Sequence, residues 1–223
     1  MRTGPFLRRL RASRSYGFVL ALVLVSFFFT AAAPDDRWSA SVLILLQALT
    51  LAAAVWTSNL TRRADVLIGV VAVAGVAVAV LRVVEPGRIP AGILALVVAL
   101  VLVATIVVIV LGIADQNAVN LQSVLGAVTV YFLLGMVYTF AYGALASLGE
   151  GPFFAQGTDG TASTRLYFSF VTLATVGYGD FTAATDLGRT VAVTEALFGQ
   201  LYLVTVLALI VSRLRPRRRA EEG

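Results

Sequence analysis

Six long apolar segments constrain this chain more than any other feature of its sequence. Each is close to the roughly 20 residues that a helix needs to cross the hydrocarbon core of a membrane. Short polar or turn-rich breaks separate the first five segments, so consecutive helices are expected to lie antiparallel. We predict spans at residues 16–33, 40–57, 64–84, 91–113, 121–148 and 187–212. The predicted fold class is therefore an all-α membrane protein with six transmembrane helices.

Composition agrees with a membrane protein and argues against an enzyme. Of the 223 residues, 59% are hydrophobic and only 13% are charged, whereas about a quarter of the residues of a soluble domain are charged. The chain has no cysteine and no histidine, so it lacks disulfides, the commonest metal ligand and the commonest general base. We therefore predict no catalytic residues and no cofactor.

The arginines predict how the chain sits in the membrane, because cytoplasmic flanks retain positive charge. All 17 basic residues are arginines. With the N-terminus inside, most of them fall on the inner side of the predicted spans. The outer side then holds only Arg37, Arg82, Arg88, Arg165 and Arg189. We predict a multi-pass protein of the cell membrane with both termini in the cytoplasm.

The N-terminal region has a second interpretation. Basic residues at 2–14, an apolar stretch at 18–30 and alanines at 31–33 are also typical of a secretory signal peptide. Cleavage would leave five spans without changing the predicted orientation of the later ones. Whether this segment is cleaved stays open.

The connection between the last two spans, residues 149–186, is much longer than the others. It contains an apolar and aromatic stretch at 164–174, which at helical rise covers only about 16 Å, half a membrane. The sequence Thr-Val-Gly-Tyr-Gly-Asp follows at once, at residues 175–180. Rings of backbone carbonyls can replace the hydration shell of K⁺. A strand that points successive carbonyls at one axis needs positive φ angles at some of its residues. Glycine adopts these at low cost, which accounts for Gly177 and Gly179.

This segment resembles the filter of the potassium channel superfamily, in particular the small bacterial-type channels with a two-helix pore module. The resemblance covers about residues 121–212. It implies a re-entrant pore helix and a selectivity filter between helices five and six, and a homotetramer, because one chain supplies one strand of the filter. It also implies that the permeant K⁺ is the ligand of the site and that Val176 and Tyr178 pack against the pore helix. The ion-binding residues it implies are Thr175, Val176, Gly177, Tyr178 and Gly179, with K⁺ at the first four.

Several residues outside the filter are candidates for supporting it. Asp180 is expected to attract cations at the outer mouth and to hydrogen-bond behind the filter. In some members of the superfamily a glutamate pairs with this aspartate, but Val171 stands at that position here. An acid within a span is costly and usually meets a partner, so Glu195 is expected either to bond to the pore helix, at Thr172 or Tyr167, or to reach the outer water.

Gly199, near the middle of the last span, has two interpretations. It is a gating hinge if the resemblance extends this far. It is equally a small residue that lets helices approach closely.

The chain divides into four predicted parts: a basic cytoplasmic N-terminus (1–15), a peripheral domain of four helices (16–113), a pore domain (121–212) and a basic cytoplasmic tail (213–223). The peripheral domain resembles a voltage sensor, but its fourth span carries no arginine ladder. We therefore expect weak or no intrinsic voltage gating. The tail is a candidate for binding anionic lipid, through Arg213, Arg215, Arg217, Arg218 and Arg219.

Two alternatives to a potassium-selective channel stay open. One is a less selective channel for monovalent cations, and the other is a non-conducting membrane subunit or adaptor. The sequence predicts neither the gating stimulus, the role of the first four helices, the rectification and conductance, nor the physiological role.

Overall fold

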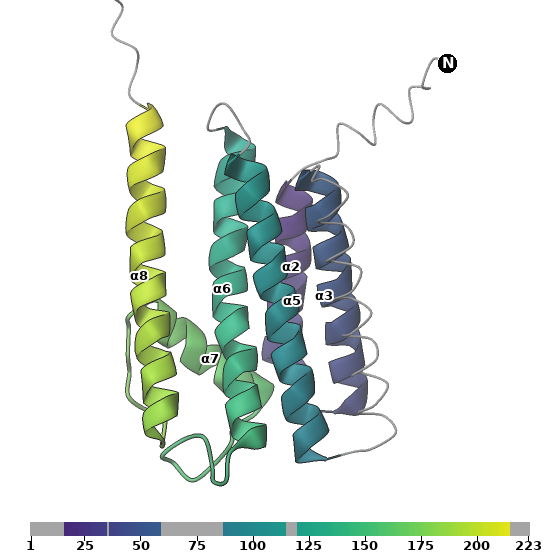
Figure 1. Ribbon diagram of the computed structural model, residues 1–223, viewed down its shortest axis with the longest axis vertical. Coiled ribbons are helices and arrows are strands. Elements are labelled where there is room, and N and C mark those ends of the chain that lie inside the picture. The colour runs from purple at the N-terminus through teal and green to yellow at the C-terminus, as the bar shows by residue number, and fades with distance from the viewer. Residues whose placement is uncertain (1–15, 35, 59–86, 115–119, 215–223) are drawn as a thin grey trace, which may run out of the picture.

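The computed structural model describes residues 16–34, 36–58, 87–114 and 120–214, and all regular elements in these ranges are helices (Figure 1). Their bounds lie within a few residues of the predicted spans, which confirms the all-α prediction for this part of the chain. The predicted span at 64–84 lies outside the described residues. The helices are α2 (Tyr16–Ala32), α3 (Arg37–Ser58), α5 (Arg88–Ala114), α6 (Leu121–Leu148), α7 (Ala162–Leu173) and α8 (Asp186–Leu214).

Three of the described helices are long and apolar enough to cross a membrane: Trp38–Ser58, Arg88–Ala114 and Leu121–Leu148. Helix α2 is a shorter apolar helix of 17 residues. A helix suits such sequences because it satisfies every backbone polar group within the segment.

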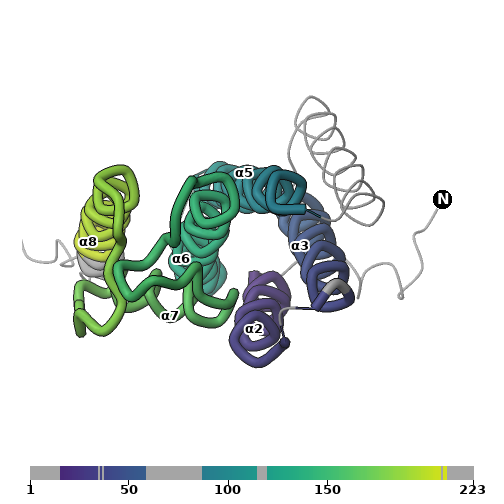
Figure 2. The backbone as a smooth tube through the Cα atoms, turned by 90° about the horizontal axis from the view of Figure 1, so that it is seen from below, coloured from purple at the N-terminus to yellow at the C-terminus, as the bar shows by residue number. Residues whose placement is uncertain are grey.

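The long helices run roughly side by side, and α6 stands between α5 and α8 (Figures 1 and 2). Helices α2, α3 and α5 pack together on one side of α6. The short helix α7 packs against α6, α8 and α2. As a result, α7 and α8 form one end of the molecule, and α8 is contacted by the described helices on one side only (Figure 2).

Two clusters of buried side chains hold this arrangement. The larger one joins α2, α3, α5 and α6 and includes Val23, Leu102 and Leu133. The smaller one is aromatic and lies at the end of α6, where Tyr142 packs with Phe153 and Phe168, at ring-centroid distances of 5.1 Å each. This aromatic cluster fixes the position of α7 beside the end of α6.

Helix α7 is too short to run alongside its neighbours for their full length. It begins near the end of the molecule where α6 stops and α8 begins, and it ends partway along them (Figure 1). Thr161 caps its first turn by accepting a hydrogen bond from the Thr164 amide at 3.1 Å, a role for which threonine is well suited. The chain after α7 returns toward the same end, which places residues 175–180 alongside α7.

Candidate functional site

The backbone after α7 alternates between two conformations. Thr175, Gly177 and Gly179 have φ angles of 56°, 58° and 81°, whereas Val176 and Tyr178 between them are not in this left-handed region. The positive φ values expected of the two glycines are therefore present. Thr175 shares the conformation although it has a Cβ, at a cost of roughly 1–2 kcal/mol. Thr175 is the one non-glycine residue with positive φ among those described.

Hydrogen bonds turn the peptide groups of this segment in a common direction. The Thr175 amide donates to the Thr172 carbonyl at 2.9 Å, and the amides of Val176 and Gly177 donate to the Val171 carbonyl at 2.9 and 3.4 Å. Because a trans peptide places the preceding carbonyl opposite to the N–H, the carbonyls of residues 174–176 point away from α7.

The side of the segment that faces away from α7 is open in the single chain. Residues 174–180 are all exposed, and a Cβ built on Gly177 or Gly179 would meet nothing within 4 Å. A row of carbonyl oxygens directed into open space is the arrangement that could coordinate a dehydrated cation, if further copies of the chain supplied the remaining oxygens.

Tyr167 of α7 supports the C-terminal end of this segment in two ways. Its ring stacks on that of Tyr178, with centroids 6.5 Å apart and planes 3° from parallel. Its hydroxyl donates a hydrogen bond to Asp180 Oδ2 at 2.8 Å. This bond raises the pKa of the Tyr167 hydroxyl above its usual value. Tyr167 is thus a hydrogen-bond partner of Asp180, a role that the apolar side chain of Val171 cannot have.

The loops on either side of α7 are joined to each other. Ala155 N donates to the Thr182 carbonyl at 2.8 Å, and Ala184 N donates to the Phe153 carbonyl at 2.9 Å. The ring of Phe181 packs on that of Phe154 at 5.1 Å. The loop before α7 and the loop after the candidate filter are therefore fixed to each other.

Glu195 lies on α8 with no exposed surface, so it does not reach water in the chain as described. Its carboxyl group meets Ser169 of α7, with Oε1 2.5 Å from the serine Oγ, and the Tyr142 hydroxyl of α6 donates to Oε2. Glu195 bonds to α7 as expected, but its partner there is Ser169 and not Thr172 or Tyr167. Tyr167 lies about 200° around α7 from Ser169, so it faces the filter instead. Thr172 contributes its backbone carbonyl to Thr175.

Gly199 lies one helical turn beyond Glu195 and is buried against the end of α7. A Cβ at this position would stand 2.4 Å from the Leu173 carbonyl oxygen, closer than real atoms approach. This contact supports close packing as a role for Gly199, and the hinge interpretation stays untested.

An ionic link that the sequence did not predict joins α5 to the loop before α7. Arg88 pairs with Asp159 at 3.2 Å and also donates to the Ala146 carbonyl at 2.8 Å. Asp159 Oδ1 in turn accepts from the Phe153 amide at 3.0 Å. The signal was present only as two opposite charges 71 residues apart, and nothing in the sequence indicates that they meet.

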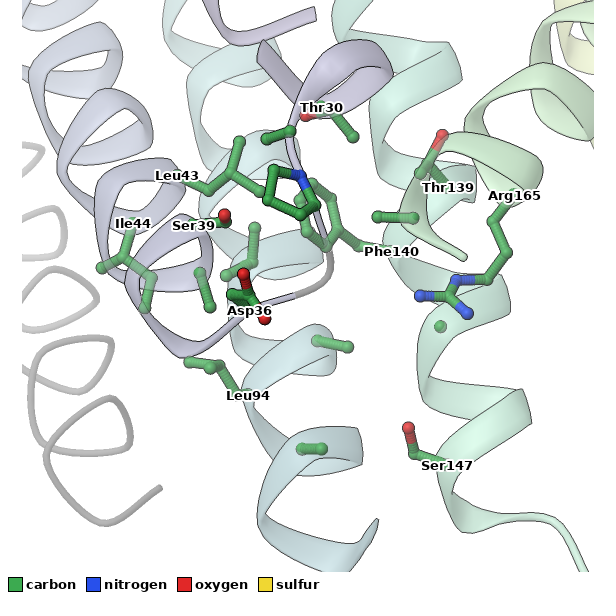
Figure 3. Close-up of a pocket in the computed structure, with 18 residues that line it drawn as sticks. Thr30, Asp36, Ser39, Leu43, Ile44, Leu94, Thr139, Phe140, Ser147 and Arg165 are labelled. Atoms are coloured by element: carbon green, nitrogen blue, oxygen red, sulfur yellow. The ribbon is translucent and has the colours of Figure 1, made fainter. Parts of the chain in front are cut away.

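A cavity of about 210 Å³ lies where the peripheral helices meet α7 (Figure 3). Arg165 of α7 lines it opposite Ser39 and Leu43 of α3 (Figure 3). The guanidinium of Arg165 donates to the carbonyls of Asp159 and Gly160 at 3.0 and 2.8 Å. None of the site residues predicted from the sequence lines this cavity.

The fold and the candidate filter resemble those of an ion channel domain, and comparison with known proteins finds the same similarity. Residues 126–215 match a protein family described as "Ion channel". The chain is 40% identical over 76 residues to "Probable potassium channel protein 2" of Methanocaldococcus jannaschii, which covers 33% of the chain and 19% of that relative. It is 32% identical over 100 residues to "Inward rectifier potassium channel Kirbac3.1" of Paramagnetospirillum magnetotacticum, which covers 44% of the chain and 34% of that relative.

These matches confirm the resemblance to the potassium channel superfamily that the filter sequence predicts. The chain spans about a fifth and about a third of the lengths of these two relatives. No solved structure gives a significant match to the chain.

Proposed function

We propose that four copies of this chain form a potassium-selective channel that conducts K⁺ passively across the cell membrane. The observation that carries the proposal is the backbone after α7, in which every second residue from 175 to 179 has a positive φ and the carbonyls of residues 174–176 point away from the helix. A single strand of this kind offers too few oxygens for a dehydrated ion, and a fourfold arrangement completes each ring.

Each residue of the filter has a role in this proposal. The carbonyl oxygens of Thr175, Val176, Gly177 and Tyr178 line the path of K⁺, and the Thr175 hydroxyl adds an innermost ring. Gly179 ends the row and Asp180 attracts cations at the outer mouth. Tyr178 holds the width of the filter through its stack on α7.

The helices around the filter fit the same arrangement. With six spans and cytoplasmic termini, α7 is a re-entrant helix whose C-terminal end points toward the middle of the membrane. The partial negative charge of that end favours a cation in the cavity below the filter. Copies of the chain would meet along α8, which carries an exposed apolar stripe, namely Leu197, Phe198, Leu201 and Val204.

The experiment that tests the proposal is K⁺ flux into liposomes containing the purified protein, with reversal potentials in mixed K⁺ and Na⁺. Gly177→Ala is expected to abolish K⁺ flux, because alanine resists a φ of 58° and would turn the carbonyls of the filter out of line. Gly157→Ala is the matched control, since Gly157 has a φ of 78° and equally open surroundings but lies outside the filter.

The outcome also separates the alternatives. Selective K⁺ flux that Gly177→Ala removes and Gly157→Ala retains supports a potassium channel. Flux without preference for K⁺ indicates the less selective cation channel, and no flux from the wild-type protein indicates a non-conducting subunit. Wild-type flux in Gly177→Ala would contradict the assignment of the filter.

A further inference from the structure

Glu195 is an ionisable side chain with no exposed surface. It joins three helices, because it lies on α8 and its two carboxyl oxygens meet Ser169 of α7 and Tyr142 of α6. The same Ser169 Oγ lies 2.7 Å from the Gly135 carbonyl oxygen of α6. One short chain of oxygen atoms therefore links the helix that precedes the filter to the two helices around it.

The number of protons in this cluster can be counted from its contacts. There are three short oxygen–oxygen contacts: Tyr142 to Glu195, Ser169 to Glu195 and Ser169 to Gly135. Tyr142 and Ser169 carry one hydroxyl proton each, and the carbonyl of Gly135 carries none. If Glu195 were ionised, only two protons would be available for the three contacts. The single Ser169 proton could lie in only one of the two Ser169 contacts, and the other would hold two oxygens within 2.7 Å of each other with no proton between them. A third proton, on Oε1 of Glu195, removes this conflict.

The charges around Glu195 favour the same state. Among the described residues, the titratable groups that interact with it are tyrosines of α6, namely Tyr131, Tyr138 and Tyr142. Among the described side chains, Arg88 pairs with Asp159 and Arg189 pairs with Asp186. Arg165 donates to two loop carbonyls. A buried carboxylate without a paired cation is strongly disfavoured relative to the neutral acid.

We propose that Glu195 is a neutral carboxylic acid that donates its proton to Ser169, which donates in turn to the Gly135 carbonyl, and that this proton is needed to hold α7 in place behind the filter. Loss of the proton leaves a buried negative charge on Glu195. It also leaves one of the two Ser169 contacts, to Glu195 or to the Gly135 carbonyl, without a hydrogen bond. Glu195 is thus a positioning residue that makes conduction dependent on pH. The pH dependence rests on the proposed function, whereas the protonation state does not.

Infrared difference spectroscopy of the reconstituted wild-type protein against Glu195→Gln tests the protonation state directly. The expected result is loss of a carbonyl stretching band of a protonated carboxylic acid in the variant. Loss of carboxylate bands at neutral pH, with no carboxylic acid band, would overturn the proposal. This reading does not require conduction, so it remains informative if the channel function itself fails.

K⁺ flux as a function of pH tests the consequence for the filter. Each protein is normalised to its own flux at mildly acidic pH. Wild-type flux is expected to be lost on the alkaline side, whereas Glu195→Gln loses this dependence because its amide keeps an N–H toward Ser169 and an oxygen toward Tyr142 without a titratable proton. Equal alkaline loss in both proteins, or no loss in the wild type, would contradict the positioning role. Ser169→Ala, which removes the relay but keeps the acid, is expected to weaken α7 docking and lower the thermal stability of the protein.

Discussion

At the scale of single residues, Tyr167 supports the candidate filter through two separate contacts. Its ring and its hydroxyl act on different partners, since the ring stacks on Tyr178 and the hydroxyl bonds to Asp180. The two contacts can therefore be separated by a single substitution.

Tyr167→Phe is expected to keep the stack and lose the hydrogen bond. Asp180 then loses its donor, and we expect conduction to decline sooner when external K⁺ is lowered. Single-channel or flux recordings over a range of external K⁺ check this. Tyr202→Phe is a matched control, because Tyr202 also donates one hydrogen bond, to the Ala127 carbonyl, but away from the filter. Equal behaviour of both variants would show that the bond to Asp180 does not support the filter.

The same bond has a predictable dependence on pH. Since it raises the pKa of Tyr167 above the usual value near 10, the phenol stays protonated and the bond stays formed from neutral pH upward through that value. Its contribution is lost only as the pH rises through the raised pKa. An alkaline decline near neutral pH would therefore come from another group.

At the scale of elements, α7 and α8 pack with matched spacing. Glu195 and Gly199 are four residues apart on α8, and they face Ser169 and Leu173, which are four residues apart on α7. Residues with this separation lie on the same face of a helix. The polar contact and the close approach of the backbones therefore belong to one interface.

Gly199→Ala tests this interface. Alanine normally stabilises a helix interior relative to glycine by roughly 0.5–1 kcal/mol. Here the added methyl group would meet the Leu173 carbonyl, and such overpacking costs about 1–3 kcal/mol. We expect a lower midpoint of thermal unfolding in detergent.

The helical glycine Gly143 provides the control, since a Cβ there would meet its nearest neighbour, Arg165 Nε, at an ordinary 3.4 Å. Gly143→Ala should leave the midpoint unchanged or raise it. A Gly199→Ala protein as stable as Gly143→Ala would mean that α7 and α8 are not packed as described.

At the scale of the whole molecule, α2 and α5 pack on α6 and α3 packs on both of them, and these described helices carry few charges. Helix α5 begins at Arg88 and has no further basic residue. Arg88 itself is tied to the loop before α7 by its pair with Asp159. In the described residues, this pair joins α5 to the loop before α7, and α5 has no row of basic residues of the kind that a voltage sensor needs.

We accordingly expect a shallow relation between conductance and voltage. Each elementary charge that crosses the field contributes about 2.3 kcal/mol per 100 mV, so steep gating needs several mobile charges in each subunit. Recordings from purified protein in planar bilayers check this. A steep relation that persists there would require mobile charges in residues 59–86 or elsewhere outside the described part of the chain.

Local sequence was sufficient to predict the described helices and the positive φ angles of Gly177 and Gly179. Apolar runs of membrane-spanning length predicted the positions of α2, α3, α5, α6 and α8 closely, because in a membrane each helix satisfies its own backbone. The glycines at 177 and 179 predicted a backbone with positive φ, since the requirement is local to each residue.

Only the tertiary structure decided which side chains meet. The partners of Glu195, the carbonyl opposite Gly199 and the pairing of Arg88 with Asp159 all join segments that are far apart in the chain. Each depends on how helices are rotated and offset against one another. A rotation of one residue, about 100°, would bring a different side chain to the contact, and the sequence of a single helix does not determine that angle.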